Sequence, residues 1–124
     1  MDAINREGME DTPKVILDQA SGAFEISGRS LPEDVNEFYE PILNWLEEYS
    51  ENPNPETYFV FKLEYFNTAS SKMILDIFLK LEEIKDTGQD VTIAWHYRDD
   101  EEDMLEAGEE YADMVEVEFE FHTY

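Results

Sequence analysis

The stretch YFNTASSKMI, residues 65–74, holds the side chains whose types and spacing best fit a chemical role. An apolar run ends at Phe66, and a second apolar pattern, with helical spacing, begins a few residues later. Between the two lie small polar residues: Asn67, Thr68, Ser70 and Ser71. The pattern predicts a strand that leads directly into a helix. The free N–H groups and the dipole at such a helix start favour an anion, so a phosphate carried by Thr68 is one hypothesis.

Two other interpretations of the same stretch stay open on the residues alone. Asn, Thr and Ser are the commonest N-cap residues, so Thr68 and its neighbours also fit a plain helix cap. The helix start also fits a module that holds a nucleotide or another anion, since the carboxyl end of a strand is the usual rim for ligands in α/β sheets. Lys72, about one turn beyond Thr68, would offer a partial counter-charge to a phosphate.

The run RDDEEDMLEAGEE supplies a second set of polar side chains. Its densest part is Asp99, Asp100, Glu101, Glu102 and Asp103. Hard cations prefer oxygen ligands, but the spacing of an EF-hand loop is absent, so we predict no metal site. A solvated acidic helix start, stabilised by the helix dipole, explains the run. A docking surface for a basic partner is compatible with that explanation.

Signatures of an enzyme are scarce in this sequence. It has no glycine-rich phosphate loop, no G-x-S-x-G and no pair of histidines at helical spacing. His96 and His122 lie on separate predicted strands, where a histidine is usually structural. We therefore predict a protein that is not an enzyme and needs no cofactor.

Composition narrows the class of partner. The chain has 124 residues, no cysteine and a formal net charge of −24. Such a charge repels nucleic acid and anionic lipid, so we expect neither nucleic acid nor a membrane as partner. The start of the chain lacks the basic and apolar regions of a signal peptide, and without cysteines a cytoplasmic location is the natural expectation.

The apolar periodicities predict one α/β domain over residues 13–124, behind a flexible N-terminal arm over residues 1–12. The predicted elements, in order, are a β-hairpin over 14–28, a helix within 29–55, a strand over 56–66, a helix from 70 to about 87, a strand over 90–97, a helix within 99–114 and a strand over 115–124. This β-β-α-β-α-β-α-β order favours a mixed, mostly parallel sheet. We expect a kink or break at Pro41 and a strand 56–66 covered on both faces.

Three segments together resemble the SiaC-type regulatory phosphoproteins of bacteria. They are SGRSLPEDVNEFYEPILNWLEEY, YFNTASSKMILDIFLKLEEI and GQDVTIAWHYRDDEEDMLEAGEEYADM, which span most of the chain from about Gly28 to Met114. The Y-F-N-T-x-S-S-K and W-x-Y-x-x-D-D-E-D-M patterns are specific in combination. Ala69, where a serine would also suit the pattern, is a minor departure.

The resemblance implies a STAS-like fold, similar to that of anti-sigma-factor antagonists, and a role in signal transduction. It implies a histidine-kinase-like Ser/Thr protein kinase and a PP2C-type phosphatase as partners that add and remove a phosphate. Carried over to this chain, the phosphoacceptor is Thr68, with Ser70 and Ser71 as neighbours that shape the site. The implied target, bound in the unphosphorylated state, is a diguanylate cyclase, hence a role in cyclic-di-GMP signalling, partner switching and biofilm regulation.

Overall fold

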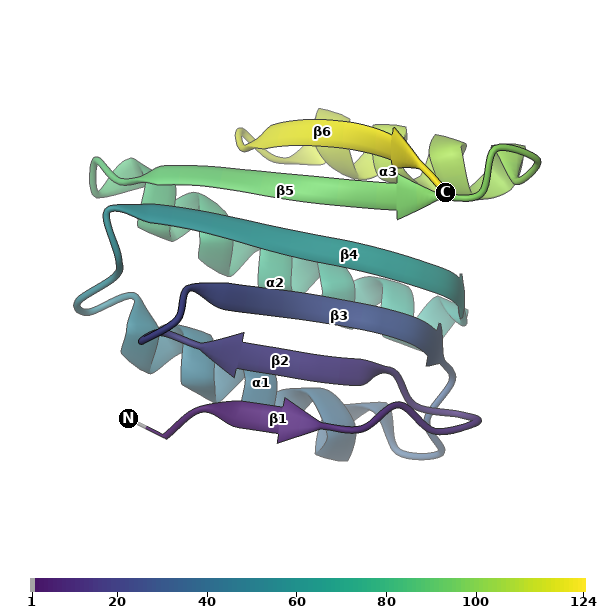
Figure 1. Cartoon of the computed structure of the whole chain (residues 1–124), viewed down its shortest axis with the longest axis horizontal. Helices are drawn as coiled ribbons and strands as arrows, with labels where there is room; N and C mark the ends of the chain where they lie inside the picture. Colours follow the sequence, from purple (N-terminus) through teal and green to yellow (C-terminus); the bar gives the residue numbers. More distant parts are fainter. Residues whose placement is uncertain (1) are drawn as a thin grey trace.

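A computed structural model describes residues 2–124 as one sheet of six strands with three helices (Figure 1). The elements are β1 (Ile4–Arg6), β2 (Lys14–Asp18), β3 (Ala23–Ser30), α1 (Val35–Tyr49), β4 (Glu56–Phe66), α2 (Thr68–Asp86), β5 (Asp90–Tyr97), α3 (Glu102–Met114) and β6 (Glu118–Thr123). None of these helices is both long and apolar enough to cross a membrane within the described part of the chain.

The strands lie in the sheet in the same order as in the sequence, from β1 to β6. The pairs β1–β2 and β2–β3 are antiparallel, and the predicted hairpin is confirmed by the register that joins Lys14 to Ser27 and Asp18 to Ala23. The pairs β3–β4, β4–β5 and β5–β6 are parallel, each connected through one helix. The predicted single α/β domain with a mixed sheet is confirmed.

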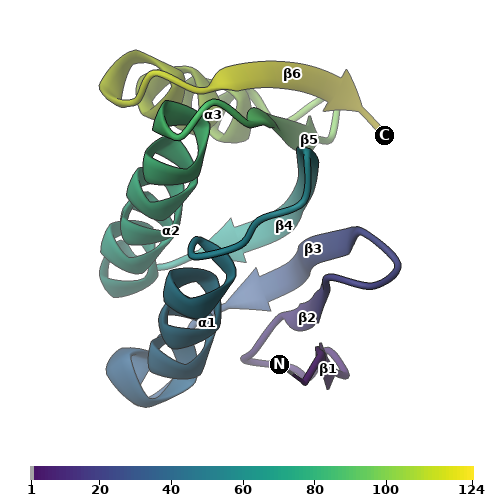
Figure 2. The same ribbon diagram turned by 90° about the vertical axis from the view of Figure 1, so that its left-hand side faces the viewer.

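All three helices cover the same face of the sheet (Figure 2). When strand order never reverses, crossovers of one hand place every helix on one side. The expectation that strand 56–66, now β4, is covered on both faces is therefore wrong. Phe59 and Phe61 are buried under the helices, whereas Tyr58 and Lys62 on the other face are exposed.

The predicted arm over residues 1–12 contains a strand that the sequence pattern did not reveal. Ile4–Arg6 pairs with Leu17–Val15 of β2, and the Trp45 indole donates a hydrogen bond of 2.8 Å to the carbonyl of Asp2. Three residues are too short to show a period of two, which is why β1 escapes sequence reasoning. Met1, the first residue of the predicted arm, lies outside the described residues.

Helix α1 is continuous through Pro41, so of the expected kink or break the break is wrong. An interior proline costs about 3 kcal/mol, because one backbone hydrogen bond is missing. The inner face of α1 buries large side chains, among them Tyr39, Ile42 and Leu46, each with no exposed surface. Burial of a side chain of this size contributes roughly 1.5–3 kcal/mol, which offsets the proline.

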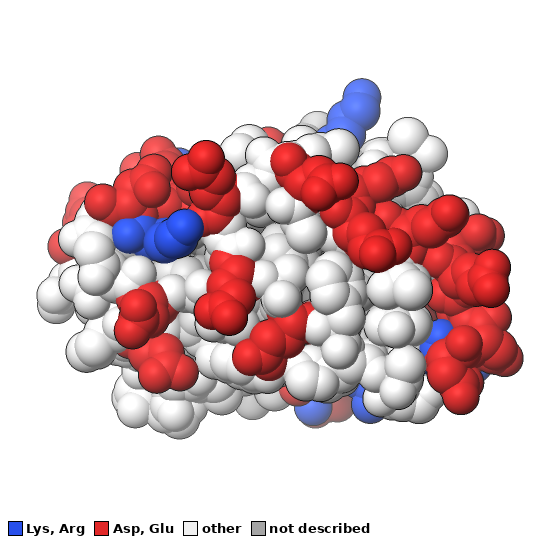
Figure 3. All heavy atoms as spheres, turned by 90° about the horizontal axis from the view of Figure 1, so that it is seen from above, with Lys and Arg blue, Asp and Glu red and all other residues white. Residues whose placement is uncertain are grey.

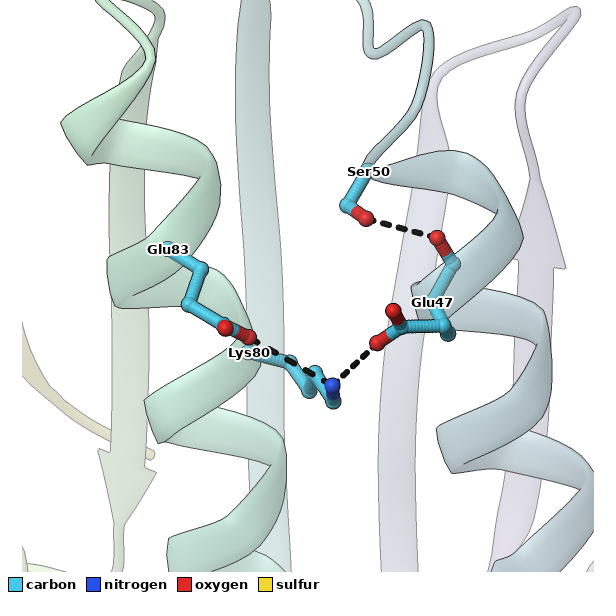
Figure 4. Close-up of polar contacts among 4 residues, drawn as sticks. All are labelled: Glu47, Ser50, Lys80 and Glu83. Carbon is cyan, nitrogen blue, oxygen red and sulfur yellow. Dashed lines mark hydrogen bonds and ion pairs between the residues drawn. The ribbon is translucent and has the colours of Figure 1, made fainter.

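The interhelical contact between α1 and α2 has a polar rim as well as an apolar centre. Lys80 of α2 forms an ion pair with Glu47 of α1 and a second one, of 3.4 Å, with Glu83 (Figure 4). The Glu47 carboxylate, as hydrogen-bond partner, raises the pKa of Lys80. Because these pairs are largely solvent-exposed, each contributes at most about 1 kcal/mol to stability.

Candidate functional site

The start of α2 follows β4 after a single residue, Asn67, and that residue is the N-cap. Its side-chain oxygen accepts a hydrogen bond of 2.8 Å from the backbone N–H of Ser70. Its own N–H donates to the carbonyl of Ser30 over 3.0 Å, which ties the cap to the end of β3. The cap is therefore complete without the Thr68 hydroxyl.

Thr68 is the first residue of α2, and its side chain is exposed to solvent. Because Asn67 caps the helix, the explanation of Thr68 as the cap itself is excluded by the geometry. An exposed hydroxyl at a helix start, outside the capping contact, is accessible to a modifying enzyme. The Asn67 side chain already occupies the N–H of Ser70, so the dipole of α2 is the main feature of this helix start that would favour an anion on Thr68.

Ser70 lies two residues further on but is fully buried. Its hydroxyl donates to the carbonyl of Ser30 over 3.1 Å and accepts from the Ser30 hydroxyl over 2.9 Å. The Ser30 hydroxyl in turn lies 2.5 Å from the phenol oxygen of Tyr39, whose pKa is raised by burial. Ser70 thus anchors the first turn of α2 to β3 and α1, and no modifying enzyme can reach it in the folded state.

Ser71 and Lys72 complete the predicted surroundings of the site. The Ser71 hydroxyl is half-buried and donates to the carbonyl of Thr68 over 2.6 Å, while its own carbonyl accepts from the Tyr111 phenol over 2.8 Å. Burial raises the pKa of Tyr111 well above its ordinary value, so this phenol stays a donor. Lys72 is exposed and lies four residues after Thr68, on the same face of α2.

A shallow hollow of about 210 Å³ runs between α2 and α3 beside this helix start. Its lining residues are Phe66, Ser71, Lys72, Leu75, Ala107, Glu110, Tyr111 and Met114. Thr68 is not one of the lining residues, but it precedes the lining residues Ser71 and Lys72 by about one helical turn on the same face of α2. Sequence reasoning missed the hollow because it depends on how α3 packs.

The acidic stretch Asp99–Asp103 forms the turn between β5 and α3 and the first residues of α3, and all of it is exposed. Glu102 and Asp103 lie in the first turn of the helix, where carboxylates interact favourably with its dipole. Asp and Glu side chains also gather at this end in the space-filling view (Figure 3). Because β4 and β5 are parallel, their carboxyl ends lie at the same end of the sheet, and Thr68 and the acidic stretch follow these two ends.

The described residues 2–124 hold no group of three or more His, Asp or Glu side chains placed to bind a metal ion. A larger hollow, of about 860 Å³, lies at the opposite end of the sheet, against Glu56, Asp90 and Glu118. The four parallel strands also lack the reversal of strand order at which ligands usually bind in α/β sheets. The helix start is thus a surface rather than a crevice.

The two histidines, distant in the sequence, are neighbours on the open face of the sheet. His96 and His122 are register partners on β5 and β6, and their rings stack with centroids 4.9 Å apart. His122 lies 3.0 Å from the Glu120 carboxylate. Partial burial, followed by the influence of His122, lowers the pKa of His96. Only strand register could have revealed this pair.

The six-stranded mixed sheet, with three helices on one face and a capped helix start at its rim, defines a small single-domain α/β protein. The model of the SiaC family of regulatory phosphoproteins matches residues 6–124, and the chain therefore belongs to the SiaC family. The resemblance to the SiaC-type proteins that the sequence indicated is confirmed.

Known relatives cover the whole domain. An uncharacterized protein of Pseudomonas aeruginosa strain UCBPP-PA14 is 27% identical over 124 residues, covering 100% of this chain and 98% of the relative. The crystal structure of apo-SiaC from P. aeruginosa matches with a TM-score of 0.90 and 28% identity, over 99% of this chain and 100% of that one. SiaC in the crystal structure of the diguanylate cyclase SiaD with its activator SiaC, also from P. aeruginosa, matches with a TM-score of 0.90 and 27% identity, over 98% of this chain and 99% of that chain.

Proposed function

We propose that this chain is a non-enzymatic, cytoplasmic signalling switch, phosphorylated reversibly on Thr68, that binds a diguanylate cyclase in the unphosphorylated state. The observation that carries the proposal is the contrast among the three hydroxyls of the first turn of α2. Ser70 is buried and Ser71 donates to a backbone carbonyl, whereas Thr68 is exposed and takes no part in the cap. The membership of the SiaC family and the complex of SiaC with SiaD support the choice of target.

The physical chemistry of the helix start explains how one phosphate would act as a switch. Unmodified, Thr68 presents a small neutral hydroxyl about one turn before the hollow between α2 and α3. A phosphate adds about 1.5–2 negative charges and a tightly held hydration shell, which an interface must displace. Unless the cyclase offers a matching Arg or Lys, desolvation and repulsion release it.

The proposal includes two modifying partners: a histidine-kinase-like Ser/Thr protein kinase and a PP2C-type phosphatase. The dipole at the start of α2 stabilises the phosphate once it is attached, and Lys72 offers a nearby charge. The acidic stretch Asp99–Asp103 lies at the same edge of the sheet and would contact a basic surface of one of these partners. Control of biofilm formation through cyclic-di-GMP would be the outcome of the circuit.

Mapping of phosphopeptides from the native host, with phosphatases inhibited, tests the phosphorylation. We expect phosphate on Thr68 and none on Ser70; a phosphatase-treated sample is the control. Absence of phosphate on Thr68 across growth conditions would contradict the proposal. Stabilisation of the unmodified chain against heat by nucleotides would instead support the anion-binding alternative.

Binding to the cyclase gives the second test. The unmodified chain should bind the SiaD-type diguanylate cyclase of the same genome, and the Thr68→Glu or phosphorylated form should bind more weakly. Thr68→Val, which keeps the shape of the side chain without a phosphoacceptor, is the matched control and should bind like the unmodified chain. Equal binding of the phosphorylated and unmodified forms would refute the switch.

A further inference from the structure

A pair of histidines lies on the face of the sheet that none of the helices α1, α2 and α3 covers (Figure 2). The Trp95 indole donates to the carbonyl of Met104 in α3, so the side chain of the next residue, His96, points to the opposite face. His122 of β6 is the register partner of His96, and the two rings stack with their centroids 4.9 Å apart and their planes at 29°. Because two paired strands hold both imidazoles, the fold itself forms the pair.

His96 has the protonation state that a metal ligand needs. Its side chain is half-buried, and burial, followed by the influence of His122 and Lys62, lowers its pKa, so the imidazole is neutral at neutral pH. A neutral imidazole has a lone pair on one ring nitrogen. No hydrogen bond to the His96 ring occurs within residues 2–124. His96 therefore offers an unoccupied nitrogen next to a second imidazole.

Glu120 fixes the tautomer of His122. The Nε2 atom of His122 lies 3.0 Å from the Glu120 carboxylate, which also accepts a hydrogen bond of 2.9 Å from the Tyr58 phenol. These two contacts lower the pKa of Glu120, so its carboxylate stays ionised and can only accept. The Nε2 atom is then the donor, and Nδ1 of His122 carries the lone pair. A carboxylate that orients a histidine in this way is the usual partner of a metal-bound imidazole.

The types of donor atom select the kind of ion. Imidazoles suit zinc, copper and nickel, whereas magnesium and calcium prefer oxygen ligands. Each nitrogen would lie about 2.0–2.1 Å from a shared ion, so the two ligand rings must be close neighbours, as these rings are. No group of three metal-binding side chains occurs within residues 2–124, so water would fill the remaining coordination positions.

The charges around the pair favour a cation. Glu25 and Glu120 act on His96 against the single positive charge of Lys62. The Lys62 ammonium also lies over the Tyr124 ring, 4.4 Å from its centroid, in a cation–π contact. The chain as a whole has a formal net charge of −24, and such a field raises the local concentration of cations.

We propose that His96 and His122 together chelate one divalent transition-metal ion such as Zn²⁺, with Glu120 as the positioning residue of His122. The ion would join β5 to the edge strand β6 on the face opposite the helices. Because a ligand that binds only the folded state stabilises that state, the bound ion would raise the melting temperature. The site shares no residue with the helix start at Thr68, so this inference goes beyond the proposed function and does not depend on it.

Titration calorimetry of the full chain with Zn²⁺, in excess Mg²⁺ to occupy the carboxylates, tests the proposal. The chain has only two histidines, so no other imidazole replaces a lost one. We expect one Zn²⁺ per chain, bound at least roughly tenfold more weakly by His96→Gln or His122→Gln, because the second ligand of a chelate has a high effective concentration. Glu120→Gln should keep the site but weaken it about tenfold, as for loss of an outer partner. Glu118→Gln makes the same change on the same face of β6 and should bind like the wild type.

Nuclear magnetic resonance of the wild-type chain adds a measurement that needs no variant. One equivalent of Zn²⁺ should shift the side-chain ¹⁵N resonances of His96 and His122 together, and it should raise the melting temperature of the wild type but not that of His122→Gln. Equal Zn²⁺ binding by the wild type and both histidine variants would show that carboxylates hold the ion and would overturn the proposal. One ion of unchanged affinity in each single variant would mean two independent imidazoles and would overturn the chelate. Circular dichroism of each variant confirms that it is folded.

Discussion

The hydroxyl network beneath the start of α2 predicts how three conservative variants rank in stability. The network runs from the Tyr39 phenol to Ser30, from Ser30 to Ser70 and from Ser70 to the carbonyl of Ser30, over 2.5, 2.9 and 3.1 Å. Ser30→Ala removes the central hydroxyl and leaves the phenol of a fully buried Tyr39 without this partner. Since a buried polar group without a partner costs about 1–3 kcal/mol, we expect a loss of about 2 kcal/mol in the free energy of unfolding.

Tyr39→Phe and Ser70→Ala should cost less than Ser30→Ala. In Tyr39→Phe the Ser30 hydroxyl still donates to Ser70, so the loss should be about 0.5–1.5 kcal/mol. In Ser70→Ala the Ser30 carbonyl keeps its bond from the Asn67 N–H, and the Ser30 hydroxyl keeps its phenol contact. We therefore expect a loss of about 1 kcal/mol there.

The double variant Ser30→Ala/Tyr39→Phe decides whether an unpaired phenol is the cause. It removes both partners, so it should be at least as stable as Ser30→Ala alone. The assay is urea unfolding followed by far-UV circular dichroism, with equal m-values as the check on two-state behaviour. A double variant that loses the sum of the two single losses, or a Ser30→Ala variant as stable as wild type, would refute the reasoning.

Three further predictions concern other parts of the fold. Gly108→Ala should lower the free energy of unfolding by about 1–3 kcal/mol and change the fluorescence of Trp95, whose ring the new methyl would meet; a more stable variant would contradict the packing. Burial raises the pKa of Tyr111, so the folded state keeps a proton that the unfolded chain loses above about pH 10, and stability should fall as the pH rises above that value. Urea unfolding should show a shallower alkaline fall in Tyr111→Phe, and an unchanged slope would argue against it. Lys80→Met should cost less than about 1 kcal/mol, with the difference from wild type shrinking in high salt, because its pair with Glu47 is exposed.

Much of the fold could be predicted because the apolar residues recur with clear periods. The hairpin, the three helices and the strand over 90–97 follow from such patterns, although α2 begins at Thr68 and not at the predicted residue 70, and its cap is Asn67. Strand β1 could not be predicted, since three residues show no period. At Pro41 the sequence predicted a feature that is absent. The local rule for an interior proline predicted a kink or break, but the helix does not break there because the packing of α1 offsets the missing hydrogen bond.

The expectation that β4 is covered on both faces was wrong, and no local sequence pattern could have shown why. The sequence of strands and helices does not determine whether strand order reverses in the sheet, and only reversal would have put helices on both sides. Within β4 the alternation of buried Phe59 and Phe61 with exposed Tyr58 and Lys62 is partly hidden by the apolar character of Tyr58 and Val60. A strand with aromatic residues on its exposed face therefore has a sequence pattern like that of a strand buried on both faces.

The sequence by itself determined most of the elements, the acidic character, a helix that begins soon after Phe66, and the kinship with the SiaC family, because these depend on neighbours along the chain. Tertiary structure alone decided which hydroxyl is accessible, since the burial of Ser70 depends on Ser30 and Tyr39 from other elements. It also decided that a hollow remains between α2 and α3, about one turn beyond Thr68, and that two distant histidines stack. Accessibility and contact are properties of packing, and packing joins residues that the sequence keeps far apart.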